Sequence, residues 1–237
     1  MIMKDIFDTQ KIGIIIYGRM SSKRFPGKVL RKIYKNKNSF EIIVDKIKKA
    51  GLKSKVVIAT SKSNNDKKIV NFCRKNNIKF FCGDHENVFN RTVECNKEFR
   101  FKYFVRICAD RPLFDVDLMI KMVRLILKKN LDIVTNANPR TFPKGLTCEV
   151  AKTKIFKIDQ KKLSKIEKEH IFNYFYKNNK YKIHNLNSNY NKKFLKKNFC
   201  IDNKKDIKII KKIFLKFSKI KKEITTDHLY KFNWSNF

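Results

Sequence analysis

Residues 13–28 read GIIIYGRMSSKRFPGK, and this stretch is the best guide to the fold. Residues 12–16 form a short apolar run, which is the pattern of a buried strand. The run stops at Gly18, and a polar loop with a Pro26-Gly27 turn pair follows. The loop carries four cations, which are Arg19, Lys23, Arg24 and Lys28. Because backbone N–H groups and side-chain cations converge at the carboxyl end of an α/β sheet, a strand that leads into such a loop predicts a phosphate pocket.

The generic phosphate-binding motifs are absent from this loop. A Walker A loop needs G-x-x-x-x-G-K-[ST], but Gly18 and Gly27 are too far apart and Val29 follows Lys28. The dinucleotide motif G-x-G-x-x-G does not occur here either. A surface loop whose charges are merely solvated is therefore the alternative interpretation. The position of the cations directly after a buried strand favours phosphate binding.

The composition indicates one sizeable folded domain. The chain has 237 residues, 42% of them hydrophobic and 21 of them phenylalanine, which suits a full core and excludes a disordered chain. The sequence has no apolar run of about 18 residues that could span a membrane, and its start is too short and acidic for a signal peptide. The six cysteines form no C-x-x-C pair, so we expect neither a zinc site nor a disulfide framework. We expect a single domain over residues 1–237 in the cytoplasm.

The net charge of +36 allows two interpretations. A basic face could bind nucleic acid or an anionic membrane. Alternatively, the abundant Lys, Asn, Ile and Phe reflect the codons of an AT-rich genome. The lysines are spread along the whole chain, and no aromatic-basic RNA-binding signature or zinc finger occurs. We therefore expect no specific nucleic-acid partner, although a positive field would attract a nucleoside triphosphate.

Strands and helices alternate after the loop. Helices are expected at residues 39–50, 66–77, 86–99 and 115–129, and buried strands at 55–60, 78–82, 103–108 and 131–135. This alternation predicts a mainly parallel α/β sheet with helices on both faces. The loops at the carboxyl ends of its strands, at 17–28, 60–66 and 109–115, should share one rim.

The second half of the chain is less regular. Strands are expected at residues 146–151, 181–186 and 199–201, helices at 154–159, 165–177 and 206–217, and a polar loop at 187–197. No linker and no internal repeat divides the chain. We expect one domain with a less regular subregion around residues 140–198.

The loop also resembles a family signature. Its pattern R-M-x-S-x-R-x-P-G-K at residues 19–28 is similar to the R-M-x-S-x-R-L-P-G-K signature of SpsF-type cytidylyltransferases of spore-coat polysaccharide biosynthesis, which are relatives of CMP-sialic acid and CMP-Kdo synthetases. The resemblance extends over residues 12–217 and implies the nucleotide-diphospho-sugar transferase fold, a three-layer α/β/α sandwich around a mainly parallel sheet. It implies transfer of CMP from CTP to an acidic sugar or related acceptor, release of pyrophosphate, Mg²⁺ as cofactor, and a homodimer as a common assembly.

Asp110 and Asp202 are the candidate metal ligands. Asp110 follows the strand at 103–108, and a carboxylate on that rim suits Mg²⁺, although a turn aspartate is the alternative. The segment at 109–115 resembles the family's G-D-x-P-L-x-D, in which the Asp binds the metal. Asp202 stands in a segment that resembles the late T-V-D-x-P-E-D, which supplies a second metal carboxylate. Its alternative role is a helix N-cap.

The candidate nucleotide ligands lie at the ends of the predicted strands. Arg19, Arg24 and Lys28 are the triphosphate ligands, because Arg offers a planar fork and Lys a point charge to phosphate oxygens. With Asp110, Arg19 and Lys28 are the candidate catalytic residues, which would offset charge on the leaving pyrophosphate. The resemblance, with Tyr17 in the place of a Gln, implies a larger nucleotide-binding set of Tyr17, Gly18, Arg19, Met20, Ser22, Arg24, Lys28, Thr60, Ser61, Arg91 and Arg106.

The resemblance places the acceptor near Gly145, Glu149 and His170. Residues 142–149 resemble the family's Y-P-x-G-L-D-x-E, with Lys144 where an Asp is common and Thr147 in place of the Asp. His170 lies in a segment similar to R-E-H-V-T, and a packing or capping histidine is the alternative.

Three other functions stay open. The charge alone suggests a nucleic-acid-binding protein. The departures from the family at Tyr17, Lys144, Thr147 and Lys205 suggest a non-catalytic relative. A glycosyltransferase of the same fold would use a D-x-D motif at a strand end, whereas here Asp115-Val-Asp117 opens a predicted helix.

Overall fold

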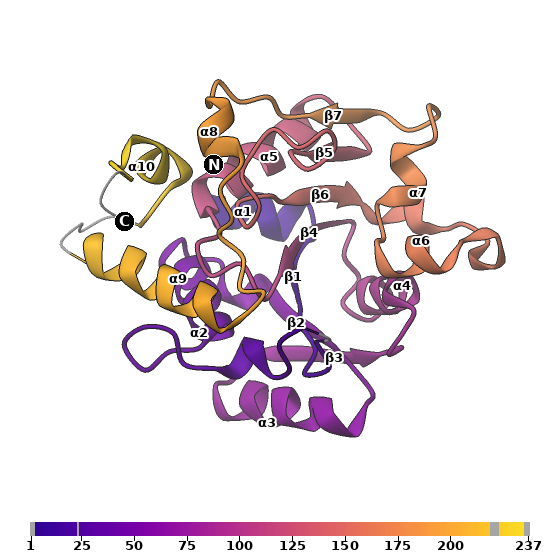
Figure 1. Ribbon diagram of the computed structural model, residues 1–237. Coiled ribbons are helices and arrows are strands. Elements are labelled where there is room, and N and C mark those ends of the chain that lie inside the picture. The colour runs from indigo at the N-terminus through magenta and orange to yellow at the C-terminus, as the bar shows by residue number, and fades with distance from the viewer. Residues whose placement is uncertain (1–2, 23, 219–222, 235–237) are drawn as a thin grey trace.

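A single seven-stranded sheet forms the centre of the molecule. The computed structural model describes residues 3–22, 24–218 and 223–234 (Figure 1). In this part of the chain the strand order is β3-β2-β1-β4-β6-β5-β7. The strands are β1 (Ile12–Tyr17), β2 (Val56–Ser61), β3 (Lys79–Gly83), β4 (Tyr103–Cys108), β5 (Ile133–Thr135), β6 (Glu149–Lys152) and β7 (Ile183–Asn185). Lys23, predicted as a loop cation, lies outside the described residues.

The sheet is mainly parallel, as predicted. β1 pairs in parallel with β2 and β4, and β3 adds in parallel beyond β2. β6 is antiparallel to both β4 and β5, and β7 runs parallel to β5. The chain builds outward from β1 to β3 and then returns to place β4 on the other side of β1. The carboxyl ends of β1 and β4 therefore form a topological switch point, where open α/β sheets bind ligands.

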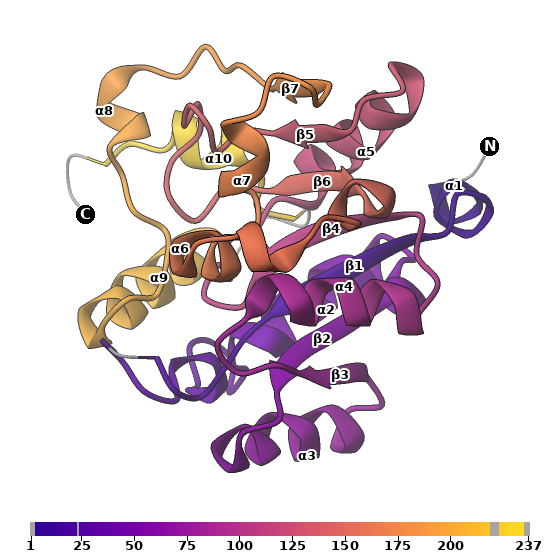
Figure 2. The same ribbon diagram turned by 90° about the vertical axis from the view of Figure 1, so that its right-hand side faces the viewer.

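Helices cover both faces of the sheet, with α4, α6 and α7 on one side and α2 and α9 on the other (Figures 1 and 2). The helices are α1 (Met3–Thr9), α2 (Ser39–Lys49), α3 (Lys67–Lys75), α4 (Val88–Glu98), α5 (Val116–Lys128), α6 (Lys165–Glu169), α7 (Asn173–Tyr176), α8 (Lys192–Leu195), α9 (Lys204–Lys216) and α10 (Thr226–Lys231). This arrangement confirms the predicted three-layer fold. None of the helices in the described ranges is long and apolar enough to cross a membrane.

The alternation of side chains along β1 explains its central place. Ile14 and Ile16 pack into the core with α2 and α5, whereas Ile15 and Tyr17 pack into the core with α4 and α7. Successive strand residues point to opposite faces, so a strand buried on both faces must be apolar throughout. All six residues of β1 are buried.

Local signals explain where the well-predicted helices begin. α2 starts at a capping box in which Asn38 and Glu41 satisfy each other's backbone N–H groups. α5 starts at Asp115, which accepts a hydrogen bond from the N–H of Leu118. The helices expected at 39–50, 66–77, 86–99, 115–129 and 206–217 are confirmed to within a few residues.

The less regular half departs from the predictions. The helix expected at 165–177 is two short helices, α6 and α7, because the chain leaves helical geometry at His170 and buries Ile171 and Phe172 in the core. The helix expected at 154–159 is a short 3₁₀ turn at Thr153–Phe156, and the polar loop at 187–197 contains α8. α1 and α10 were not predicted.

The strand expected at 199–201 does not form. The N–H of Phe199 donates to the carbonyl of Lys144 at 2.7 Å, and the N–H of Ile201 donates to the carbonyl of Asp110 at 2.9 Å. The segment is thus hydrogen-bonded to two loops, at Lys144 and Asp110, and, among the described residues, to no strand of the sheet. This docking brings Asp202 to the end of β4.

Candidate active site

A pocket of about 500 Å³ opens at the carboxyl ends of β1 and β4. It collects most of the predicted site residues. The predicted residues that line it are Tyr17, Gly18, Arg19, Ser22, Arg24, Lys28, Arg91, Arg106, Asp110 and His170. These residues come from the loop after β1, from α4, from β4 and its following loop, and from the end of α6. The structure therefore brings together residues up to 153 positions apart, from Tyr17 to His170, in one cavity.

The loop after β1 is a closed unit whose shape depends on glycine. A Cβ on Gly18 would lie 2.5 Å from the Phe40 ring and 2.9 Å from Ala109, so only glycine fits there. Gly27 has φ +71°, and its N–H donates to the carbonyl of Met20 at 2.9 Å. This bond closes residues 20–27 into a loop that sets Arg24 and Lys28 at the pocket.

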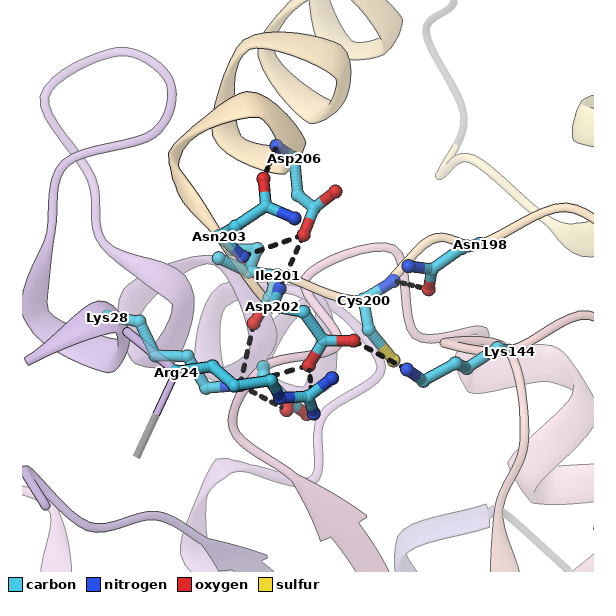
Figure 3. A network of polar contacts seen from close by, with 10 residues as sticks. Arg24, Lys28, Lys144, Asn198, Cys200, Ile201, Asp202, Asn203 and Asp206 are labelled. Carbon is cyan, nitrogen blue, oxygen red and sulfur yellow. Dashed lines mark hydrogen bonds and ion pairs between the residues drawn. The ribbon is translucent and has the colours of Figure 1, made fainter. Parts of the chain in front are cut away.

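Lys28 lies close to both predicted metal ligands, Asp110 and Asp202, and Figure 3 shows it beside Ile201 and Asp202. Its Nζ donates to Asp110 Oδ2 at 2.7 Å and to the carbonyl of Ile201 at 2.6 Å, and it is 3.6 Å from Asp202 Oδ1. The Lys28 side chain is only 10% exposed. The two carboxylates, 92 positions apart in sequence, thus face one buried ammonium group, which shows that this position favours a cation.

Asp202 is the centre of a wider cation cluster. It accepts hydrogen bonds from Arg24 at 2.8 Å and from Lys144, which approach it from opposite sides (Figure 3). Burial alone would raise the pKa of Asp202, but the Lys144 hydrogen bond and the charges of Lys144, Lys28 and Arg24 outweigh it and lower that pKa. Asp202 is not the N-cap of α9, which is Asn203. Its carboxylate instead pairs with cations, two of which, Arg24 and Lys28, line the pocket.

Buried arginines line the inner part of the pocket. Arg91 is 3% exposed, and its Nε and Nη1 atoms have no hydrogen-bond partner within the described residues. Burial lowers the pKa of Arg91, but a guanidinium remains protonated in proteins. Arg106 is paired with Glu149, with Nη1 3.2 Å from Oε1, and lies over the Tyr17 ring. Buried donors without partners are costly, so Arg91 points to an anionic ligand.

Some predicted residues lie outside the lining of this pocket. The structure places Thr60 and Ser61 in buried positions at the end of β2, and Met20 beside a neighbouring cavity of about 630 Å³. The Tyr17 ring lines the active-site pocket, but its hydroxyl bonds to Thr92 at 2.9 Å and faces α4. Burial raises the pKa of Tyr17, so its hydroxyl keeps its proton at neutral pH.

The predicted acceptor residues have different surroundings. His170 is exposed at the pocket edge, next to Glu169, which forms a salt bridge with Arg19 at 3.0 Å. Glu149 is 5% exposed and is held by Arg106. Gly145 has φ +95° and lies against the backbone of the 199–201 segment, where an added Cβ would come within 2.4 Å of the carbonyl carbon of Phe199.

Gly145→Ala is expected to lower the free energy of unfolding by about 2–4 kcal/mol, because it combines a left-handed backbone with a backbone clash. Urea unfolding would measure it. Gly51 is a matched control, since it also has positive φ (+76°) but nothing within 4 Å of a Cβ. Gly51→Ala should cost only about 1 kcal/mol. Equal losses in the two variants would contradict a packing role for Gly145.

Two residues that contact the loops around the pocket, without lining it, were missed. Asp66 is fully buried and bonds to the loop after β1, and Arg111, whose Nη1 donates to the carbonyl of Thr147, lies behind Asp110. A helix-start aspartate was visible in the sequence at Asp66, but its distant partner was not. Within the described ranges no cluster of three or more His, Cys, Asp or Glu residues exists that could hold a metal alone. A metal here would complete its shell with oxygen atoms from a substrate or from water.

Comparison with known proteins agrees with this geometry. The model of the family described as cytidylyltransferase matches residues 13–231. The chain belongs to the cytidylyltransferase family. It is therefore a CTP-dependent nucleotidyltransferase, and this finding favours that class over the glycosyltransferase and nucleic-acid-binding alternatives.

Curated relatives support the same family. A Methanocaldococcus jannaschii protein described as uncharacterized is 32% identical over 172 residues, which cover 71% of this chain and 68% of that protein. The spore coat polysaccharide biosynthesis protein SpsF of Bacillus subtilis is 28% identical over 160 residues, which cover 66% of this chain and 65% of SpsF. The predicted resemblance to SpsF is thereby confirmed.

Solved structures confirm the fold. A cytidylyltransferase from Leptospira borgpetersenii superposes with a TM-score of 0.84 at 27% identity and covers 92% of each chain. A CMP-2-keto-3-deoxy-manno-octonic acid synthetase in complex with CTP superposes with a TM-score of 0.64 at 13% identity, covering 86% of this chain and 98% of that one. The second likeness is one of fold alone.

Proposed function

We propose that the protein transfers CMP from CTP to an acidic sugar or a related small acceptor, with Mg²⁺ and release of pyrophosphate, for the synthesis of a surface glycan. The observation that carries the proposal is a pocket lined by Lys28, Asp110 and the buried Arg91, in which the Lys28 ammonium faces the carboxylates of both Asp110 and Asp202. The membership of the family and the SpsF relative support CTP and a sugar-related pathway. We place the reaction in the cytoplasm, and a homodimer stays a prediction.

The cations of the pocket fit a triphosphate. Arg19, Arg24 and Lys28 come from the loop after β1, and Arg91 reaches the same cavity from α4 with unpartnered N–H groups. Nucleotidyl transfer places little covalent chemistry on the protein, because positioning and charge neutralisation do most of the work. These cations would offset the negative charge that develops on the α-phosphate and on leaving pyrophosphate.

Asp110 and Asp202 fit a magnesium ion. Both supply hard carboxylate oxygens, and both already face a cation, Lys28 Nζ, at 2.7 and 3.6 Å. Magnesium typically takes one or two protein carboxylates and completes its shell with phosphates and water. When bound it would polarise the phosphate and acidify the attacking hydroxyl. Lys28 would then be free to bind the phosphates.

The chain's own residues orient the reaction. The acceptor oxygen forms a bond to the α-phosphorus, the bond from the α-phosphorus to the oxygen bridging to the β-phosphorus breaks, and the hydroxyl proton leaves to solvent. Among the described residues that line the pocket, His170 and Glu169 lie at its outer edge, and Glu169 is already paired with Arg19. We assign this edge, together with Gly145 and Glu149, to the acceptor side, and the nucleotide side to Tyr17, Gly18, Met20, Ser22, Thr60, Ser61 and Arg106.

A pyrophosphate-release screen tests the proposal. Four nucleoside triphosphates are combined with a panel of acidic sugars and sugar phosphates in the presence of Mg²⁺. We expect release with CTP and one acceptor class. CTP binding without turnover across the panel would indicate a non-catalytic relative. Tight binding of nucleic acid with a steep salt dependence, and no CTP binding, would overturn the proposal.

A further inference from the structure

Asp66 is a buried carboxylate that no part of the proposed reaction uses. It is 0% exposed, and neither of its oxygens faces the pocket lining. Oδ1 accepts the backbone N–H of Met20 at 2.7 Å. Oδ2 accepts the hydroxyl of Ser61 at 2.5 Å and the N–H of Ser61 at 3.1 Å. One side chain thus ties the end of β2 to the loop after β1, where Met20 lies 46 positions before Asp66.

The carboxylate does not serve its own helix. Asp66 stands at the N-cap of α3, where an aspartate normally accepts an N–H of the first turn, yet it makes no such bond. No salt bridge to Asp66 occurs in the described part of the chain. Its charge is stabilised by three hydrogen bonds and by the positive end of the α3 dipole. Asp66 thus lies at the start of α3, but its carboxylate accepts a hydrogen bond from the loop after β1 instead of from α3.

The bond to Met20 lies at the residue where the loop closes on itself. The N–H of Met20 is held by Asp66, and the carbonyl of the same residue accepts the N–H of Gly27 at 2.9 Å. Both the N–H and the carbonyl of Met20 are therefore hydrogen-bonded, and Met20 connects the loop to Asp66. Arg19 precedes the anchored residue, and Arg24 and Lys28 follow it, so its orientation sets where the phosphate ligands lie.

The other end of the link is itself braced. The Ser61 hydroxyl, which donates to Asp66, also contacts His85 Nδ1 at 2.9 Å and accepts the N–H of Ser63 at 3.2 Å. The ends of β2 and β3 and the start of α3 thus meet at one buried polar cluster. Through Met20 and Asp66, the loop after β1 is therefore connected to the ends of β2 and β3 and is not stabilised by its own contacts alone.

We propose that Asp66 is the positioning residue of the phosphate loop: its buried carboxylate holds the described loop residues, 18–22 and 24–28, in the conformation that binds the triphosphate. The inference rests on the proposed function and adds a specific residue to it. A loop that is ordered for only a fraction of the time binds its ligand more weakly by that fraction, while the saturated complex reacts normally. Loss of Asp66 should therefore raise the KM for CTP and leave kcat nearly unchanged.

The test compares Asp66→Asn and Asp66→Ala with Asp115→Asn. Asparagine keeps one acceptor oxygen, which can serve Met20 or Ser61 but not both, and it carries no charge. We expect the KM for CTP to rise about 10-fold in Asp66→Asn and about 50-fold in Asp66→Ala, with kcat within about threefold of the wild type. In ¹⁵N NMR the Met20 amide, whose bond to a carboxylate should place it downfield, should move upfield in both variants.

Asp115 provides a matched control. It is 5% exposed, caps α5, and ties a distant segment through Thr226, whose N–H and hydroxyl donate to its Oδ2 at 2.6 and 2.8 Å. Asp115→Asn should lower the Tm as much as Asp66→Asn does, with no change in the KM for CTP and no shift of the Met20 amide.

Two results would overturn the inference: an unchanged KM in a folded Asp66→Asn, or an equal rise of KM in Asp115→Asn, which would trace the effect to stability. If the wild type binds no CTP, the proposed function fails. The Met20 amide then still decides whether Asp66 holds the loop, because that readout needs no substrate.

Discussion

Asp110→Asn is expected to lower kcat/KM for CTP by at least about 10³-fold, the largest effect of any single substitution considered. Asparagine keeps the size of the side chain and one oxygen but removes the charge that faces Lys28 at 2.7 Å and that would hold the metal. The rate of pyrophosphate release is measured across a Mg²⁺ titration. Raising the Mg²⁺ concentration should not restore the rate, because the lost ligand belongs to the transition state as well as to binding.

Asp132 is the matched control for Asp110. Asp132 is also a mostly buried aspartate in an ion pair, with Lys152 at 3.4 Å. It lies near the amino end of β4, away from Asp110 at the carboxyl end, because Lys152 pairs with the first residue of β4. Asp132→Asn should leave kcat/KM unchanged within about twofold. A similar loss of rate in both variants would remove Asp110 from the site.

Lys28→Met is expected to lower kcat/KM for CTP by about 10²- to 10³-fold. Methionine keeps most of the buried stem but removes the ammonium that donates to Asp110 and to the carbonyl of Ile201. The loss should fall on kcat as well as on KM, since charge on pyrophosphate is greatest in the transition state. Steady-state kinetics with CTP as the varied substrate would separate the two.

Lys152→Met controls for the burial of a lysine. The Lys152 side chain is 8% exposed, close to the 10% of Lys28, and it binds Asn130 and Asp132 far from the pocket. Both methionine variants should lose stability, but only Lys28→Met should lose turnover. Full activity in a folded Lys28→Met would show that the ammonium only neutralises the carboxylates of Asp110 and Asp202 and does not bind phosphate.

Local patterns carried the prediction of the first half of the chain. The apolar run at 12–16 is buried on both faces of the sheet, and Phe104, Val105 and Ile107 of the strand at 103–108 are buried as well, so the apolar composition indicates directly where these strands lie. Parallel strands bring their carboxyl ends to one rim. The sequence therefore predicted that the loop after β1 and Asp110 lie in one site, although it gave no information on their contacts.

Contacts between distant segments were the part that could not be predicted. The segment at 199–201 is apolar, but whether it pairs with a strand or docks between loops depends on the Lys144 and Asp110 carbonyls. In the sequence Asp66 looks like an ordinary N-cap of a helix. Its actual hydrogen-bond donor, the N–H of Met20, lies in a distant part of the chain and could not be predicted. Lys144 stood out as a departure from the family, and only the structure shows that it neutralises Asp202.

The most direct test of the central claim is ³¹P NMR of the wild-type enzyme with CTP, Mg²⁺ and the acceptor class found in the screen. If the pocket between β1 and β4 is a cytidylyl-transfer site, the three CTP signals will be replaced by free pyrophosphate and one new α-phosphorus ester signal in a 1:1 molar ratio. The appearance of CDP and orthophosphate, or unchanged CTP beside a folded enzyme that binds it, would contradict the account.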